Sequence, residues 1–228
     1  MTGCLMTEIT VETKKNIILI ITGGNVDRDF AALWVKEHPF DHCIAVDRGV
    51  ESAFDLKIVP DLALGDFDSL KAEDMEYLKQ QDIPVRQYEP EKDATDTELA
   101  LEAAVRLDPG EIYILGGTGN RADHMLTTLL SLERLSDKGI FACVIDERNK
   151  IYAGKGDIYI EKGRQHGDYV SLAVISDSAQ ITIEGMKYDL DRQKIKRGSS
   201  LCQSNEIMAE VARICVHSGT VLVFESKD

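Results

Sequence analysis

The segment "DLALGDFDSLKAEDMEYLKQQ", residues 61–81, contains the parts from which the first two-thirds of the chain is built. Residues 61–64 have an apolar strand pattern, and residues 69–81 read as a helix. Between them lie Gly65 and two aspartates, Asp66 and Asp68, on either side of a phenylalanine. Glycine, aspartate and serine are ordinary turn residues, but paired carboxylates are also the ligands that Mg²⁺ prefers. The segment therefore predicts a strand, a turn that is either solvated or metal-binding, and a helix.

The same alternation of strand and helix patterns extends outward from this segment. Residues 27–38 are expected to form a helix with Phe30, Leu33 and Trp34 on one face, and Leu126, Leu129 and Leu130 share a face of a later helix. Thr95 and Glu98 form a capping box before another helix, which Pro109 and Gly110 end. The expected strands are residues 16–22, 42–46, 61–64, 83–88, 111–115 and 139–145. Strands that alternate with helices predict a mostly parallel sheet covered on both faces.

The sequence pattern changes after about Arg148. Short β-type runs such as "YVSLAVIS" and "TVLVFES" follow one another, separated by Gly, Asp and Ser, with no strongly helical segment among them. We therefore expect an α/β fold class: an N-terminal mostly parallel open sheet with helices on both faces, plus a C-terminal all-β sandwich domain. The predicted divisions are a loose leader (1–15), an α/β domain (16–148) and a β-sandwich domain (149–228).

Composition and charge restrict the possible partners. The 228 residues carry a formal net charge of −14, which argues against a nucleic-acid partner because phosphate backbones require clustered Lys and Arg. A nucleotide remains possible, and an acidic protein that handles phosphates is expected to use Mg²⁺ as its positive charge. The five cysteines lack the short spacings of zinc or redox sites, so we expect reduced, buried thiols. The apolar run at residues 16–22 is too short to span a bilayer, and we expect a cytoplasmic protein with no membrane partner.

The polar clusters of the α/β part follow the strands, where ligands of open α/β sheets bind. Carboxylates gathered at one sheet edge repel one another unless a cation lies between them. Purely structural explanations remain open, since Asp96 and Glu98 would stabilise a helix N-terminus and the glycines of residues 116–121 could form a simple turn. The coincidence of five such loops favours a Mg²⁺-dependent phosphoryl or pyrophosphoryl transferase. The residues expected at this edge are Asp47, Asp66, Asp68, Asp93, Asp96 and Asp123, with Arg48, Lys92 and Arg121 among them.

Several motifs, in this order, resemble the thiamin pyrophosphokinase family: "DLALGDFDSL", "EKDATDTELAL", "GGTGNRADHMLTTLLSL" and, in the β part, "EGMKYDL" followed by "GSSLCQSNEI". The resemblance runs from about Asn16 to the C-terminus. It implies that ATP and thiamin react to give thiamin diphosphate and AMP. It also implies a homodimer whose active sites lie in clefts shared between the two chains.

The candidate site residues combine the strand-end loops with this resemblance. Asp66, Asp68 and Asp96 are expected to hold Mg²⁺, and the predicted catalytic set is Asp68, Asp96, Arg121 and Asp123. Asp68 or Asp96 is expected to take the proton of the thiamin hydroxyl. The ATP phosphates are assigned to Asp47, Arg48, Lys92, Gly116, Gly117, Thr118, Gly119, Asn120 and Arg121. The resemblance assigns thiamin to Tyr188, Ser200, Ser204 and Asn205.

Other interpretations remain open on the sequence alone. The order Asp66-Phe67-Asp68-Ser69 superficially fits a phosphatase with an aspartyl nucleophile. The acceptor could be another alcohol, such as a pterin. The sequence is also consistent with a non-catalytic module that senses a nucleotide or thiamin. Two positions depart from the family pattern. Tyr188 replaces a tryptophan found in some members, and Cys202 lies within the serine-rich stretch, where it is either neutral or a point of oxidation sensitivity.

Overall fold

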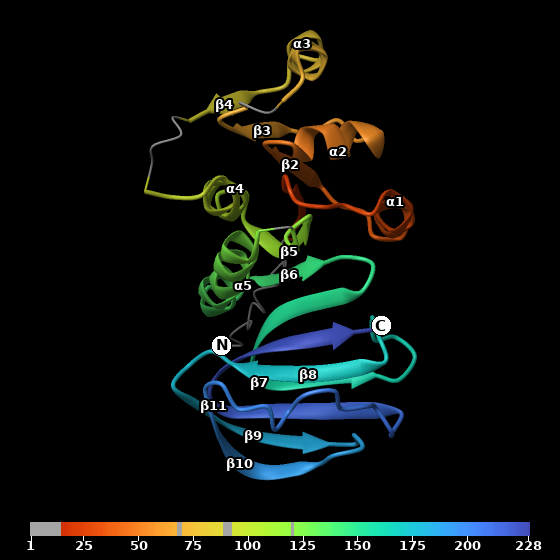
Figure 1. The fold of residues 1–228 in the computed structure, drawn as a ribbon, viewed down its shortest axis with the longest axis vertical. Helices are drawn as coiled ribbons and strands as arrows, with labels where there is room; N and C mark the ends of the chain where they lie inside the picture. Colours follow the sequence, from red (N-terminus) through yellow and green to blue (C-terminus); the bar gives the residue numbers. More distant parts are fainter. Residues whose placement is uncertain (1–14, 68–69, 89–92, 120) are drawn as a thin grey trace, which may run out of the picture.

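A parallel sheet forms the first part of the fold. The computed structural model describes residues 15–67, 70–88, 93–119 and 121–228 (Figure 1). The parallel strands lie side by side in the order β6-β5-β1-β2-β3-β4. Their bounds are β1 (Asn16–Ile21), β2 (His42–Val46), β3 (Leu62–Gly65), β4 (Val85–Gln87), β5 (Pro109–Leu115) and β6 (Phe141–Ile145).

Helices cover both faces of this sheet, as predicted (Figure 1). Leu19 and Ile21 of β1 pack in one core cluster, and their neighbours Ile18 and Ile20 pack in the other, because successive side chains of a strand point to opposite faces. The first cluster contains residues of α1 (Arg28–Glu37), α2 (Gly49–Asp55) and α3 (Ala72–Gln80). The second contains residues of α4 (Asp96–Val105) and α5 (Ala122–Asp137).

Side-chain caps begin α1, at Asp27, and α4, at Thr95. The Glu98 amide donates to the Thr95 hydroxyl over 3.2 Å, so Thr95 caps α4 as predicted. Pro109 and Gly110 were expected to end the preceding helix, but they begin β5. The leucines that share a face of α5 were expected in the core, but only Leu129 is buried, whereas Leu126 and Leu130 are exposed.

The second part of the chain is built from antiparallel strands, as predicted. Its elements are β7 (Asn149–Glu161), β8 (Tyr169–Val174), β9 (Ser178–Glu184), β10 (Leu190–Lys196) and β11 (Val211–Ser226). The long strand β11 pairs with β7 along most of its length, with β9 through its first half and with β8 through its second half. An irregularity between Val216 and Val221 separates the two halves. One long strand thereby pairs with three others, β7, β8 and β9.

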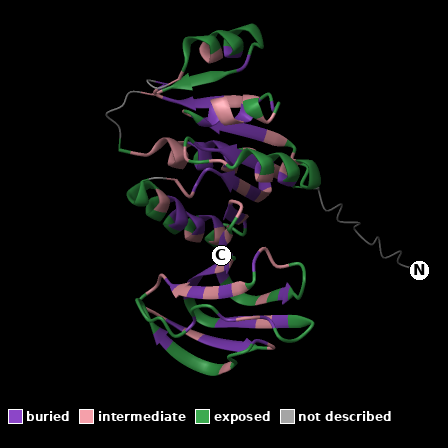
Figure 2. Ribbon diagram, turned by 45° about the vertical axis from the view of Figure 1, so that its right-hand side comes forward, coloured by how far each residue is buried: buried purple, intermediate pink, exposed green. Residues whose placement is uncertain are grey.

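The two parts are joined by a continuous sheet. The chain leaves β6 at Ile145, makes a turn over residues 146–149, and returns antiparallel as β7. Beside this junction the Glu225 carboxylate, which is 2% exposed, accepts a hydrogen bond from the His166 amide over 2.8 Å and lies 3.6 Å from the Lys150 amine. A buried carboxylate is tolerated when it is paired in this way. Figure 2 shows the buried interior continuing from the helical part into the β part.

The cysteines behave as small apolar residues. Cys43, Cys143, Cys202 and Cys215 are buried and carry free thiols, as predicted for them. Burial raises the pKa of the Cys202 thiol to about 11, so it is protonated at neutral pH and a weak nucleophile. Cys4 and the other residues of the predicted leader up to residue 14 lie outside the described residues. Within the described part of the chain, no helix is both long and apolar enough to cross a membrane.

Candidate active site

A cavity of about 890 Å³ lies at the carboxyl ends of the parallel strands. Its wall combines the loops that follow β1, β2, β3 and β5 with the first residues of α4. Parallel strands bring such loops together because their carboxyl ends meet at one edge of the sheet. Of the residues predicted from the sequence, the cavity is lined by Asp47, Arg48, Asp66, Asp93, Asp96, Gly116, Gly117, Gly119 and Arg121.

The loop after β3 is fixed on both sides of Asp66. Gly65 has a φ of +148°, and a Cβ atom at this position would lie 1.8 Å from the Asp47 carboxylate. Phe67 has a φ of 57° and its side chain is buried in the core. An aromatic residue in this region of backbone space is strained, and such strain often marks functional loops. The buried ring anchors the loop, so Asp66 is held at the cavity wall, whereas Asp68 lies outside the described residues.

Substituting Gly65→Ala is expected to lower the free energy of unfolding by about 2–4 kcal/mol, because the added methyl group collides with Asp47 and the backbone becomes strained. The matched control is Gly139→Ala. Gly139 also has a positive φ, of +71°, but nothing lies within 4 Å of an added Cβ. The control should cost only about 1 kcal/mol. The free energy of unfolding of both variants is measured by thermal or denaturant unfolding. Equal losses of this free energy would contradict the close approach of Gly65 to Asp47.

The glycine-rich loop after β5 packs against the loop after β1. A Cβ atom on Gly24 would lie 2.0 Å from the Gly116 carbonyl oxygen, so these two backbones meet directly. Because glycine has no Cβ atom, these residues allow the two loops to approach closely as well as to turn. Thr118, although predicted at the phosphates, does not line the cavity, and its hydroxyl donates to the Asp146 carboxylate over 2.5 Å. Asn120 lies outside the described residues.

Arg121 and Asp123 form an exposed ion pair at the start of α5. An Arg121 Nη2 to Asp123 Oδ2 distance of 2.7 Å indicates a charge-assisted hydrogen bond. Arg121 holds the pKa of the Asp123 carboxyl at about 2. Because this pKa is lowered, the pair is intact above about pH 4 and is lost only as the pH falls through about 2. Asp123 does not line the cavity, whereas its partner Arg121 does.

The cavity is strongly acidic. Its described carboxylates come from Asp47, Glu51, Asp55, Asp66, Asp93 and Asp96, against the cations Arg48 and Arg121. Carboxylate oxygens are the donors that suit Mg²⁺, so the residues present fit this ion. No group of three His, Cys, Asp or Glu side chains among the described residues converges in a metal-binding arrangement. Asp68 and Lys92, both predicted here, lie outside the described residues.

The α2 contribution to the cavity was not foreseen. Glu51, Ser52 and Asp55 line it, and so does His124. A usable signal was present, because α2 begins within three residues of the end of β2 and so starts at the ligand-binding edge. Glu51 also lies 3.9 Å from the Lys71 amine, which links α2 to the start of α3.

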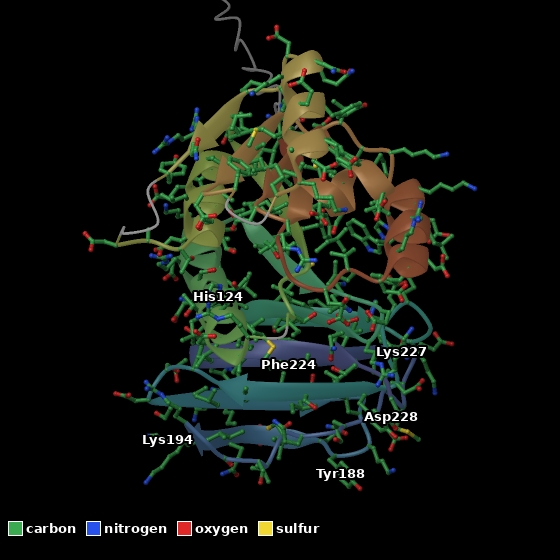
Figure 3. All side chains as sticks on the ribbon, turned by 45° about the horizontal axis from the view of Figure 1, so that its top comes forward. His124, Tyr188, Lys194, Phe224, Lys227 and Asp228 are labelled. Carbon is green, nitrogen blue, oxygen red and sulfur yellow. The ribbon has the colours of Figure 1, made fainter. Side chains whose placement is uncertain are left out.

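The predicted thiamin residues lie elsewhere on the chain. Tyr188 is 59% exposed in the connection between β9 and β10, and Figure 3 shows it at the lower end of the β part, away from His124. Asn205 is buried, and its side chain exchanges hydrogen bonds with the Tyr188 backbone, at 3.0 Å from the amide and 2.8 Å to the carbonyl. Asn205 therefore holds the Tyr188 segment in place. None of Tyr188, Ser200, Ser204 and Asn205 lines the acidic cavity of its own chain.

The chain combines an acidic cavity at the edge of a parallel α/β sheet with a second part built from β-strands. This fold and site define a phosphoryl-transfer enzyme. Residues 30–144 match the family model described as thiamin pyrophosphokinase, catalytic domain, and residues 156–221 match the thiamin pyrophosphokinase, vitamin B1 binding domain. The chain belongs to the thiamin pyrophosphokinase family, which confirms the resemblance seen in its motifs.

Relatives with known names or structures agree with this assignment. A thiamine pyrophosphokinase of Bacillus subtilis is 33% identical over 216 residues, which cover 94% of this chain and 95% of that protein. A crystal structure of thiamine pyrophosphokinase from Bacillus subtilis has a TM-score of 0.83 at 31% identity, covering 93% of this chain and 99% of that one. The structure from Geobacillus thermodenitrificans has a TM-score of 0.81 at 31% identity, with 93% and 98% covered.

Proposed function

We propose that this enzyme transfers the diphosphate group of ATP to the hydroxyl group of thiamin, giving thiamin diphosphate and AMP. The observation that carries the proposal is the acidic cavity at the sheet edge, where loops from four strands and the start of α4 meet. The match to both family domains supports thiamin as the acceptor over a pterin. Nothing in the comparisons favours a phosphatase or a sensing module.

Within the cavity, Asp66 and Asp96, together with Asp68, would hold Mg²⁺. When bound, the ion would neutralise charge on the phosphate oxygens. The chain's own contribution is positioning: the loop of Gly116, Gly117 and Gly119 offers backbone amides near a helix N-terminus, and Arg121 adds a fixed positive charge. Asp123 keeps the Arg121 guanidinium oriented through their ion pair.

The proton of the thiamin hydroxyl needs a carboxylate acceptor. Asp123 is poorly suited, because a group with a pKa of about 2 holds a proton weakly. Asp96 lies on the cavity wall at the first residue of α4. We assign the acceptor role to Asp96 or to Asp68.

Thiamin would be held between two copies of the chain. Tyr188, Ser200 and Ser204 are exposed and do not line the cavity of their own chain, which favours a homodimer in which they face the partner's cavity. Thiamin is a cation, and the excess of carboxylates in that cavity would attract it. The free, buried thiols are in keeping with a reducing, cytoplasmic location.

The test is incubation of the purified protein with Mg²⁺, thiamin and ATP labelled at the γ-phosphorus. We expect AMP and thiamin diphosphate in equal amounts, with the label retained in thiamin diphosphate, because both terminal phosphates are transferred together. ADP with thiamin monophosphate would contradict diphosphate transfer. A phosphoaspartate trapped on Asp66 would indicate the phosphatase mechanism, and unchanged ATP would indicate a sensing module. A pterin alcohol supplied in competition tests the choice of acceptor.

A further inference from the structure

The glycine-rich loop is bonded at its tip to the turn that leads into the β part. The hydroxyl of Thr118 donates to Asp146 Oδ2 over 2.5 Å. Asp146 is half-buried and directly follows β6. Its other oxygen, Oδ1, accepts hydrogen bonds from the backbone amides of Arg148 and Asn149, each over 2.7 Å. One carboxylate therefore contacts both the loop after β5 and the turn between β6 and β7.

Thr118 faces away from the cavity while its neighbours face it. Gly117 and Gly119 line the cavity, and Thr118 between them does not. The base of the loop is held separately, since Gly116 packs against Gly24 and a Cβ on Gly117 would lie 2.8 Å from Val144 of β6. The bond from Thr118 to Asp146 adds a third point of attachment, at the tip.

The turn by itself does not account for the short hydrogen bond at Oδ2. The two backbone amides of the turn use Oδ1. The Asn149 side chain lies 3.1 Å from Oδ1 and 3.3 Å from Oδ2, so the short bond at Oδ2 comes from Thr118. A hydroxyl bonded to a carboxylate is a charge-assisted hydrogen bond, roughly twice as strong as a neutral one.

We propose that Asp146 is a positioning residue for the ATP phosphates: through Thr118 it holds the glycine-rich loop at the position where Gly117 and Gly119 meet the substrate. The inference rests on the proposed function, because it assigns the phosphates to this loop. It also changes the role of Thr118, from a direct phosphate ligand to the residue that anchors the loop. Asp146 itself touches no substrate in this assignment.

The first test compares two substitutions at Thr118. Thr118→Val removes the hydroxyl and keeps the shape of the side chain, whereas Thr118→Ser keeps the hydroxyl. We expect the KM for ATP to rise about tenfold in the valine variant and to stay within about twofold of normal in the serine variant. The KM for thiamin should stay within about twofold in both, because the loop is assigned to ATP alone. An unchanged KM for ATP in Thr118→Val would overturn the proposal.

A double-mutant cycle separates anchoring from direct contact. If Thr118 acts only through Asp146, adding Thr118→Val to Asp146→Ala should weaken ATP binding no further. If Thr118 touches the phosphates itself, the two effects should multiply, and this result would overturn the proposal. Should Asp146→Ala unfold, Asp146→Asn replaces it, since the amide keeps one oxygen for the turn and loses the charge facing Thr118.

Calorimetric titration with MgATP in the absence of thiamin distinguishes this inference from the proposed function. A wild-type protein that binds ATP but forms no thiamin diphosphate would contradict the proposed function, and the cycle could still be evaluated from the binding constants. A wild-type protein that binds no ATP would overturn both.

Discussion

Replacing Asp66 by asparagine is expected to reduce diphosphate transfer by more than about 100-fold, beyond the loss typical of residues that only support a metal ligand. Asp66 lies on the cavity wall, held there by the buried ring of Phe67. The fold should remain intact or become slightly more stable, because one of several neighbouring negative charges is removed. The measurement is the rate of AMP and thiamin diphosphate formation at a series of Mg²⁺ concentrations, together with thermal unfolding.

The matched control for this prediction is Asp82→Asn. Asp82 is exposed outside the cavity and has a φ of 54°, a conformation that asparagine also tolerates. The control removes the same charge and should retain normal activity. A near-normal rate for Asp66→Asn at millimolar Mg²⁺ would contradict this prediction. It would mean that the loop after β3 is a solvated turn that does not bind Mg²⁺.

Two inactive variants, Asp66→Asn and Tyr188→Ala, are expected to restore activity when they are mixed and allowed to exchange subunits. If each site takes its acidic loops from one chain and Tyr188 from the other, a mixed dimer contains one site with both lesions and one with neither. Random exchange makes about half of the dimers mixed, so about a quarter of the wild-type sites should return. The reason to expect this result is that the exposed Tyr188 does not line the cavity of its own chain and lies away from the cavity residue His124 (Figure 3).

The mixing experiment needs two controls. Tyr188→Ala alone must be severely impaired in thiamin use, and subunit exchange must be demonstrated with differently tagged chains. Absence of recovery after demonstrated exchange would mean that each site is built within one chain. A monomer by sedimentation at the assay concentration would exclude the shared site directly.

Much of the fold followed from local patterns in the sequence. The alternation of apolar runs with helix-type segments predicted a parallel sheet covered on both faces, and Thr95 correctly marked the start of α4. The individual strands and helices depend on residues close in sequence, so periodicity and capping reveal them. The gathering of Asp47, Asp66 and Asp96 at one edge was also predictable, because it follows from parallel strand direction alone.

Features that depend on contacts between distant segments could not be predicted in this way. The exposure of Leu126 and Leu130 reflects how much of α5 the sheet can cover, which periodicity does not specify. The assignment of Glu51 and Asp55 to the cavity required the orientation of α2.

The sequence predicted an α/β part followed by an all-β part, and a glycine-rich loop beside a phosphate site. Only the tertiary structure showed that one sheet runs unbroken from β6 into β7, and that Thr118 is bonded to Asp146, 28 residues further along the chain. A hydroxyl in a glycine-rich loop can face a phosphate or a neighbouring turn with equal local preference. The choice between them is made by the position of the Asp146 carboxylate in the turn after β6, and that position is a property of the folded chain.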